Sequence, residues 1–215
     1  MVDVVANHMG PENGDFNSLS LFNQPHHYHP SCQYGNSPNQ WDLENCRIAG
    51  VLPDLNTEDG WVIFQLYKWI HWLVKEFSFD GIRIDTVKHV RKDFWPGFVR
   101  ASGVFAMGEV FDGNPKYLGE YQSGMDSIFN YAMYYTINDV FGKNRGSMWA
   151  LESRINQVRE THRDVSLLGS FLDNHDNPRF MAMHHDRLSL RNAVVFTLMT
   201  EGIPIIYYGT EHCKL

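Results

Sequence analysis

The 215-residue sequence lacks any run of lysine or arginine, and acidic residues outnumber basic ones by 25 to 18. Nothing in it therefore resembles the basic surface of a nucleic-acid-binding protein. Long apolar stretches are also missing. The run at 193–199 stops at Thr200 and Glu201, too short to span a membrane. No secretory signal peptide opens the chain, because Met1 leads directly into 2–5, a predicted strand.

Cysteine is scarce as well, with Cys32, Cys46 and Cys213 the only three. The first two lie in one polar stretch and could close a loop. All three could equally be buried thiols. By contrast, apolar residues make up 43% of the chain and aromatic residues 14%, which favours a globular domain over a disordered one.

Short apolar runs alternate with helical patterns along most of the chain. The runs at 1–6, 79–84, 104–110, 167–172 and 204–208 predict strands buried on both faces, and 127–130 is a weaker candidate. Helices are predicted at 60–77, around 151–158 with Ser147 as N-cap, and at 187–199. Such alternation is typical of parallel βαβ units, so the fold class is α/β.

Residues 10–58 interrupt this rhythm with a polar stretch rich in Gly, Pro, Asn and His. A structureless loop of that length is improbable, so we expect a small excursion domain held by Cys32 and Cys46. Its aromatic residues Tyr28, Tyr34 and Trp41 could stack on sugar rings, but a satellite core for the excursion domain is the preferred interpretation.

Carboxylates follow three of the predicted strands, at Asp85, Glu109 and Asp176. In a (β/α) barrel, catalytic groups gather at the carboxyl ends of strands, so the three are expected to meet at one mouth. Cleavage of a glycosidic bond needs one carboxylic acid and one carboxylate, and a third can stabilise the transition state. Arg83 is two residues before Asp85 and should share its face of the strand, where it keeps that carboxylate ionised.

Six motifs in order resemble the α-amylase family, glycoside hydrolase family 13. They are DVVANH at 3–8, LPDLN at 52–56, GIRIDTVKH at 81–89, GEV at 108–110, DNHD at 173–176 and GIPIIYYG at 202–209. Residues 92–97 further resemble the secreted fungal-type members. The resemblance implies an incomplete TIM (β/α)8 barrel that covers strands three to eight. Strand three would fall at 1–9, the excursion (B-like) domain at 10–58, and helix three to strand eight at 59–215.

The same resemblance implies endo-hydrolysis of α-1,4-glucosidic bonds in starch with retention of configuration. Asp85 would be the nucleophile, Glu109 the general acid and base, and Asp176 the residue that favours a distorted sugar ring. Substrate contacts would come from the following side chains: His8, Arg83, Lys88, His89, Asp112 and His175.

A calcium ion is also implied by the resemblance. Its ligands would be the side chains of Asn7 and Asp54 with backbone carbonyls at Glu44 and His89. Without the resemblance, Asn7 and Asp54 could simply cap loops. The family further implies a secreted, disulfide-bonded monomer that acts on an α-glucan, with no nucleic-acid or membrane partner.

Two departures from the family pattern leave alternatives open. Nothing corresponds to strands one and two, and the sequence stops just after strand eight, with Cys213 near its end. A truncated, inactive amylase-like chain or a binding scaffold is therefore one alternative. An α-glucosidase or glucan transferase of the same family is another, although Lys88 and His89 favour an α-amylase.

Overall fold

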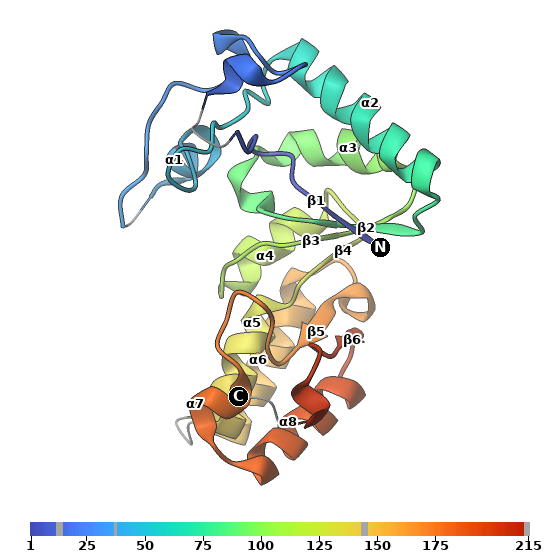
Figure 1. Ribbon diagram of the computed structural model, residues 1–215. Helices are drawn as coiled ribbons and strands as arrows, with labels where there is room; N and C mark the ends of the chain where they lie inside the picture. Colours follow the sequence, from blue (N-terminus) through green and yellow to red (C-terminus); the bar gives the residue numbers. More distant parts are fainter. Residues whose placement is uncertain (12–14, 37, 143–145, 213–215) are drawn as a thin grey trace. The chain divides into compact units, whose positions relative to one another are not determined.

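A computed structural model describes residues 1–11, 15–36, 38–142 and 146–212 (Figure 1). The chain forms two compact units, Met1–Val110 and Phe111–Leu215. The boundary follows Glu109 by one residue, so the predicted nucleophile and acid both belong to the first unit. The domain bounds expected from the sequence stay a prediction.

The first unit is built on parallel strands, as predicted. β1 (Val2–Val4) pairs with β2 (Gly81–Ile84), which pairs with β3 (Phe105–Gly108). β1 is shorter than the apolar run 1–6. Beyond Val4 the backbone bonds to residues outside the sheet: the Asn7 carbonyl accepts a hydrogen bond from the Leu55 amide, and the Met9 amide donates one to the Pro53 carbonyl. These bonds tie the strand end to the excursion segment.

Helix α2 (Gly60–Phe77) has the bounds predicted from its apolar spacing. The carboxylate of Asp59 caps its first turn, and Ser78 ends it in a left-handed conformation with φ 54°. The buried side chains of the helix are those of Val62, Leu66, Ile70 and Val74. The helix packs against α3 (Trp95–Ser102), which was not predicted from the sequence because Pro96 interrupts the pattern at what proves to be the first turn.

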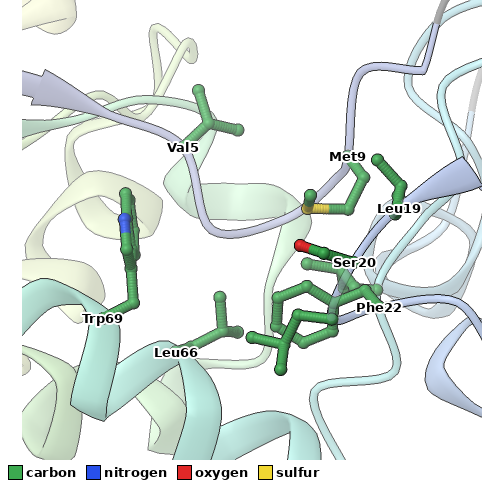
Figure 2. Close-up of a pocket in the computed structure, with 9 residues that line it drawn as sticks. Val5, Met9, Leu19, Ser20, Phe22, Leu66 and Trp69 are labelled. Carbon is green, nitrogen blue, oxygen red and sulfur yellow. The ribbon is translucent and has the colours of Figure 1, made fainter.

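An apolar pocket of about 300 Å³ opens beside α2 (Figure 2). Leu66 and Trp69 of the helix line it together with Val5 and residues of the 19–22 segment. Figure 2 shows Leu66 and Phe22 side by side, with the Ser20 hydroxyl among carbon and sulfur atoms. A sugar needs convergent polar groups, so this pocket does not fit an active site for carbohydrate.

The excursion segment contains two short 3-10 helices, Phe16–Ser18 and Pro25–His27, and helix α1 (Gln40–Asn45). Cys32 and Cys46 form a disulfide, which confirms the loop-closing alternative for this pair; Cys213 lies outside the described residues. Tyr28 is buried, and its hydroxyl donates to the Phe22 carbonyl. The core interpretation is wrong for Trp41, which is 61% exposed.

The second unit continues the alternation. Its elements are α4 (Pro115–Gln122), β4 (Ser127–Ile128), α5 (Tyr131–Ile137), a π-helical turn (Asn138–Gly142), α6 (Met148–Thr161), β5 (Gly169–Phe171), α7 (Phe180–His184), α8 (Arg187–Met199) and β6 (Ile203–Ile205). β5 pairs in parallel with β6, and Phe129, next to β4, bridges to Gly169 of β5. The predicted Ser147 cap and the helix at 187–199 are confirmed. No helix among the described residues is long and apolar enough to cross a membrane.

His162, which ends α6, is a buried group that should make the unfolding free energy depend on pH. It is 7% exposed, its Nδ1–H donates to the Val158 carbonyl, and burial lowers its pKa. The unfolded chain therefore binds a proton more readily, so stability is complete above about pH 6.5 and declines as the pH falls below it. We expect His162→Gln to lose less stability than the unaltered protein between pH 7 and pH 5 in urea unfolding.

The exposed His212 provides the matched control, because His212→Gln removes an imidazole whose side chain is 75% exposed. This control should keep the pH dependence of the unaltered protein. If the unfolding free energies of the His162 and His212 variants changed equally between pH 7 and pH 5, the role assigned to burial of His162 would be contradicted.

Candidate active site

Asp85 and Glu109 occupy equivalent places at the ends of neighbouring strands. The Asp85 amide donates to the Val4 carbonyl at 2.9 Å, and the Glu109 amide donates to the Ile84 carbonyl at 2.7 Å. Each residue thus continues its strand by one position beyond the ladder. Because the strands are parallel, both carboxylates emerge at the same edge of the sheet. Glu109 is 7% exposed, so little water reaches it.

Arg83 of β2 lies between these carboxylates. One terminal nitrogen is 2.5 Å from Asp85 Oδ1 and 2.9 Å from Asp3 Oδ1, and the other is 3.7 Å from Glu109 Oε2. Burial alone would lower the pKa of Arg83, but its carboxylate partners outweigh burial and raise the pKa. The expected pairing with Asp85 is confirmed. The approach to Glu109 was not foreseen, because it depends on the register of β2 against β3.

Thr86 joins the two sides of this edge and was missed in the sequence. Its backbone has φ 53°, a left-handed conformation that is unfavourable for a β-branched residue. In this conformation its amide donates to Glu109 Oε2 at 3.2 Å and its hydroxyl donates to Asn7 Oδ1 at 3.0 Å. Those two bonds offset the strain. A threonine gives no sequence signal for a positive φ, unlike glycine or asparagine.

The turn after Thr86 carries Lys88 and His89, in the 3-10 helix Val87–His89. His89 is buried, with its Nδ1 3.2 Å from the Leu43 carbonyl and its ring stacked on Tyr34. Burial, helped by the charge of Lys88, lowers the pKa of His89 to about 4. The imidazole is therefore neutral near pH 7, with the proton on Nδ1 to satisfy the carbonyl.

The predicted calcium ligands Asn7 and Asp54 lie together and are 1% and 3% exposed. The Asn7 amide donates to Asp54 Oδ1 at 3.0 Å, and His29 Nδ1 is 2.6 Å from Asp54 Oδ2. Burial raises the pKa of Asp54 to about 6. Burial would lower the pKa of His29, but its bonds to Asp54 and Glu58 raise it to about 9. No cluster of three His, Cys, Asp or Glu side chains suited to a metal occurs in the described ranges.

Other predicted contacts of the first unit have local partners. His8 is half-buried, its Nδ1–H donates to the Met9 carbonyl, and its backbone bridges to Asp54. The Glu44 side chain of α1 accepts a hydrogen bond from Gln40. The group that the resemblance assigns to calcium is a different one, the Glu44 backbone carbonyl. The contact between Leu43 and His89 holds α1 against the turn that follows β2.

The second unit holds Asp176, His175 and Asp112. Asp176 and His175 follow β5, are exposed, and lie 3.2 Å apart at their side chains. The Asn174 side chain accepts from the Asp176 amide and donates to the Tyr131 hydroxyl, which fixes the turn. Asp112 accepts from the Asn114 amide at 2.8 Å. The meeting of Asp176 with Asp85 and Glu109 stays a prediction.

Two further residues of this turn were missed as site candidates. Asp173 is 3% exposed and accepts hydrogen bonds from Thr210 and from the Phe180 amide. The guanidinium of Arg179 lies 3.9 Å from the centre of the Tyr207 ring. Asp173 appeared in the sequence only as the first residue of a motif. Arg179 had no neighbouring signal, since its partners are about 30 residues away.

Parallel strands alternating with helices, with acidic residues at the carboxyl ends, define the class of α/β enzymes whose sites lie at that edge. The family model for the alpha amylase catalytic domain matches residues 1–214, and the chain belongs to that family.

Relatives of known name agree with this assignment. Alpha-amylase 1 of Lipomyces kononenkoae is 38% identical over 98% of this chain and 35% of its own length. Alpha-amylase 2 of Schwanniomyces occidentalis is 40% identical over 98% of this chain and 43% of its own. The chain thus spans less than half the length of these relatives.

A solved structure gives the fold. The alpha-amylase of Malbranchea cinnamomea matches with a TM-score of 0.93 and 41% identity, over 99% of this chain and 47% of that chain. The predicted partial (β/α)8 barrel is confirmed by this likeness.

Proposed function

We propose that the protein hydrolyses internal α-1,4-glucosidic bonds of starch and related α-glucans. The observation that carries the proposal is the Arg83 side chain, which lies 2.5 Å from Asp85 and 3.7 Å from Glu109 at one edge of a parallel sheet. Relatives about 40% identical are named alpha-amylases. Release of reducing ends from soluble starch by the natural protein that carries this sequence tests the proposal, and no release would contradict it.

The chemistry of this pair is a double displacement. Glu109 gives its proton to the glycosidic oxygen, which leaves as an alcohol, while a carboxylate oxygen of Asp85 bonds to the anomeric carbon. Glu109 then takes a proton from water, whose oxygen displaces Asp85 and releases the sugar with retained configuration. Arg83 forms an ion pair with Asp85 and orients its carboxylate for attack on the anomeric carbon.

The remaining predicted residues would bind and orient the glucan. Asp176 would hold the ring that is being cleaved, and His8 and His175 would donate to its hydroxyls. Lys88, His89 and Asp112 would contact the leaving-group side. The neutral state of His89 supports this role, since an imidazole can hydrogen-bond a hydroxyl without a charge to desolvate.

A glucan transferase or α-glucosidase of the same family is less favoured. A cyclomaltodextrin glucanotransferase structure matches at 25% identity, well below the named alpha-amylases. Product analysis discriminates the reactions: an endo-hydrolase releases mixed oligosaccharides from starch, a transferase makes cyclic or longer products, and an exo-acting glucosidase releases glucose alone.

We also propose a structural calcium ion at Asn7 and Asp54, with carbonyl ligands at Glu44 and His89. Both side chains are nearly fully buried, and each carries an oxygen of the kind that a hard cation prefers, the amide oxygen of Asn7 and the carboxylate of Asp54. When bound, the ion would supply positive charge that neutralises the buried Asp54 carboxylate. The ion would tie the excursion segment to the end of β1 and take no part in the chemical step.

Chelation is therefore expected to destabilise the protein. Calcium at about a thousandfold over its Kd contributes about 4 kcal/mol, which corresponds to a Tm shift of roughly 10 °C. We expect EDTA to lower the Tm by that order and excess calcium to restore it. Asp54→Asn should melt at a lower temperature and respond little to either. A Tm of the unaltered protein that is indifferent to EDTA would contradict the site.

We also propose that the protein is secreted, because it contains the Cys32–Cys46 disulfide and such bonds persist in oxidising compartments. Recovery of the protein from the culture medium of its source, rather than from the cells, would support it. Recovery from the cytosol alone would contradict it.

A further inference from the structure

Asp173 is a buried carboxylate of the second unit that the proposed double displacement does not use. It is 3% exposed. Its Oδ1 accepts a hydrogen bond from the Thr210 hydroxyl at 2.9 Å, and its Oδ2 accepts one from the Phe180 amide at 3.3 Å. Both donors are uncharged. Burial of a carboxyl group is costly for the fold unless it is fully hydrogen-bonded, so a role beyond packing is indicated.

The bond between Asp173 and Phe180 closes the turn that carries the predicted third acid. These two residues are the ends of a segment whose middle presents Asp176, with a side chain that is 41% exposed. Within the segment, the Asp176 amide donates to Asn174 Oδ1 at 3.1 Å. One carboxyl group thus fixes the base of the turn, and an internal hydrogen bond fixes the backbone of Asp176 itself.

Thr210 connects the same carboxyl group to a cation. Its hydroxyl donates to Asp173 and accepts a hydrogen bond from a terminal nitrogen of Arg179 at 3.4 Å. A hydroxyl has one hydrogen and two lone pairs, so it can serve both partners at once. Thr210 is 4% exposed, which leaves little water to compete for these bonds. The charge of Arg179 therefore reaches Asp173 through one uncharged group.

Arg179 is held in addition by two aromatic rings. Its guanidinium carbon lies 3.9 Å from the centre of the Tyr207 ring and 4.9 Å from that of Tyr208. Such contacts attract a cation to the face of a ring. Arg179 belongs to the turn after β5, whereas both tyrosines follow β6. These contacts and the Thr210 hydrogen bonds thus join the segments that follow two neighbouring strands.

The strands themselves do not need this connection. β5 and β6 already pair from Gly169 to Phe171 through their backbones, with Phe171 opposite Ile205. Asp173 lies two residues beyond the last pair on one strand, and Tyr207 lies two residues beyond it on the other. The side-chain contacts therefore act where the ladder has ended, and what they fix is the turn that carries Asp176.

We propose that Asp173, Thr210 and Arg179 are positioning residues, which hold the Asp176 turn in the conformation needed for cleavage. We call them the Asp173–Thr210–Arg179 network. The inference rests on the proposed function, because it takes Asp176 to act on the sugar ring that is being distorted. An interaction that matters most for the distorted ring contributes to kcat more than to KM. Loss of the network should therefore lower kcat and leave KM for soluble starch within about twofold.

Thr210 offers a matched pair of variants for the test. Thr210→Val removes the hydroxyl at nearly constant volume and should lower kcat about tenfold or more, since small misplacements of a reacting group have effects of that size. Thr210→Ser keeps the hydroxyl and should retain the parent kcat. Arg179→Gln, at a half-buried position that tolerates change, should lower kcat by a smaller factor.

Thr197→Val is the control for a purely structural effect. Thr197 is fully buried in α8 of the same unit, and its hydroxyl donates to the Ala193 carbonyl at 2.9 Å. This variant should lose stability in urea unfolding but keep kcat. If Thr210→Val kept kcat as Thr197→Val does, or if Thr210→Ser were as slow as Thr210→Val, the positioning role would be overturned. In an Asp176→Asn background, Thr210→Val should cause no further loss.

Hydrogen exchange separates the network from the proposed hydrolysis. Amides of residues 173–180 should exchange faster in Thr210→Val and Arg179→Gln than in the parent, and Thr197→Val should leave them unchanged. A protein that releases no reducing ends, yet shows this faster exchange, would refute the hydrolase and keep the network as the element that holds the turn. An active protein with unchanged exchange and kcat in both network variants would refute the network alone.

Discussion

Replacing Glu109 with glutamine is expected to lower the rate of starch hydrolysis by about 10²- to 10⁴-fold, the usual contribution of a positioned general acid. The amide has nearly the same shape, and its oxygen can still accept the Thr86 amide hydrogen, so the site should stay folded. What is lost is the proton for the leaving oxygen. A reducing-sugar assay on soluble starch measures the effect.

Glu160→Gln is a suitable control, because it removes an exposed carboxylate on the outer side of α6. This variant should retain the full rate. A Glu109→Gln protein as active as the Glu160→Gln control would show that another group supplies the proton, and the assignment of the acid would then be wrong.

Replacing Arg83 with methionine should destabilise the first unit by about 3–5 kcal/mol, the usual cost of leaving a buried carboxylate without its partner. The Arg83 side chain is 14% exposed, and those of Asp85 and Glu109 are 25% and 9% exposed, so water screens the exposed charge only in part. Activity should fall with stability, because Asp85 loses the cation that orients its carboxylate. Urea unfolding measures the first effect.

Two further variants separate charge from size. Arg83→Lys keeps the charge but not the two-pronged geometry, so it should lose less stability than the methionine variant. Adding Asp85→Asn to Arg83→Met should recover part of the lost stability, because the unpaired charge is removed. A double variant no more stable than Arg83→Met would mean that the arginine acts through packing alone.

Features that depend on residues close together in the sequence were predicted correctly. The apolar spacing of α2 and the Ser147 cap of α6 are decided by neighbours a few residues away, and each was predicted. The pairing of Arg83 with Asp85 also follows from the two-residue period of a strand. These features need no knowledge of which strands are neighbours.

Features set by distant contacts escaped prediction. The approach of Arg83 to Glu109 depends on strand register, and the short length of β1 depends on bonds from residues 53–55. The exposure of Trp41 shows that an aromatic residue in a polar segment need not find a core. The family motifs supplied the predicted site residues without explaining what holds them.

Thr86 links the predicted cation site to the predicted acid. Its hydroxyl donates a hydrogen bond to Asn7 and its amide donates one to Glu109. Its left-handed backbone conformation restricts how far the residue can move without breaking either bond. A shift of Asn7 would therefore be passed to the Glu109 carboxylate within one residue. A substitution at the predicted cation site that displaces Asn7 should accordingly lower the reaction rate under conditions in which the protein is still folded.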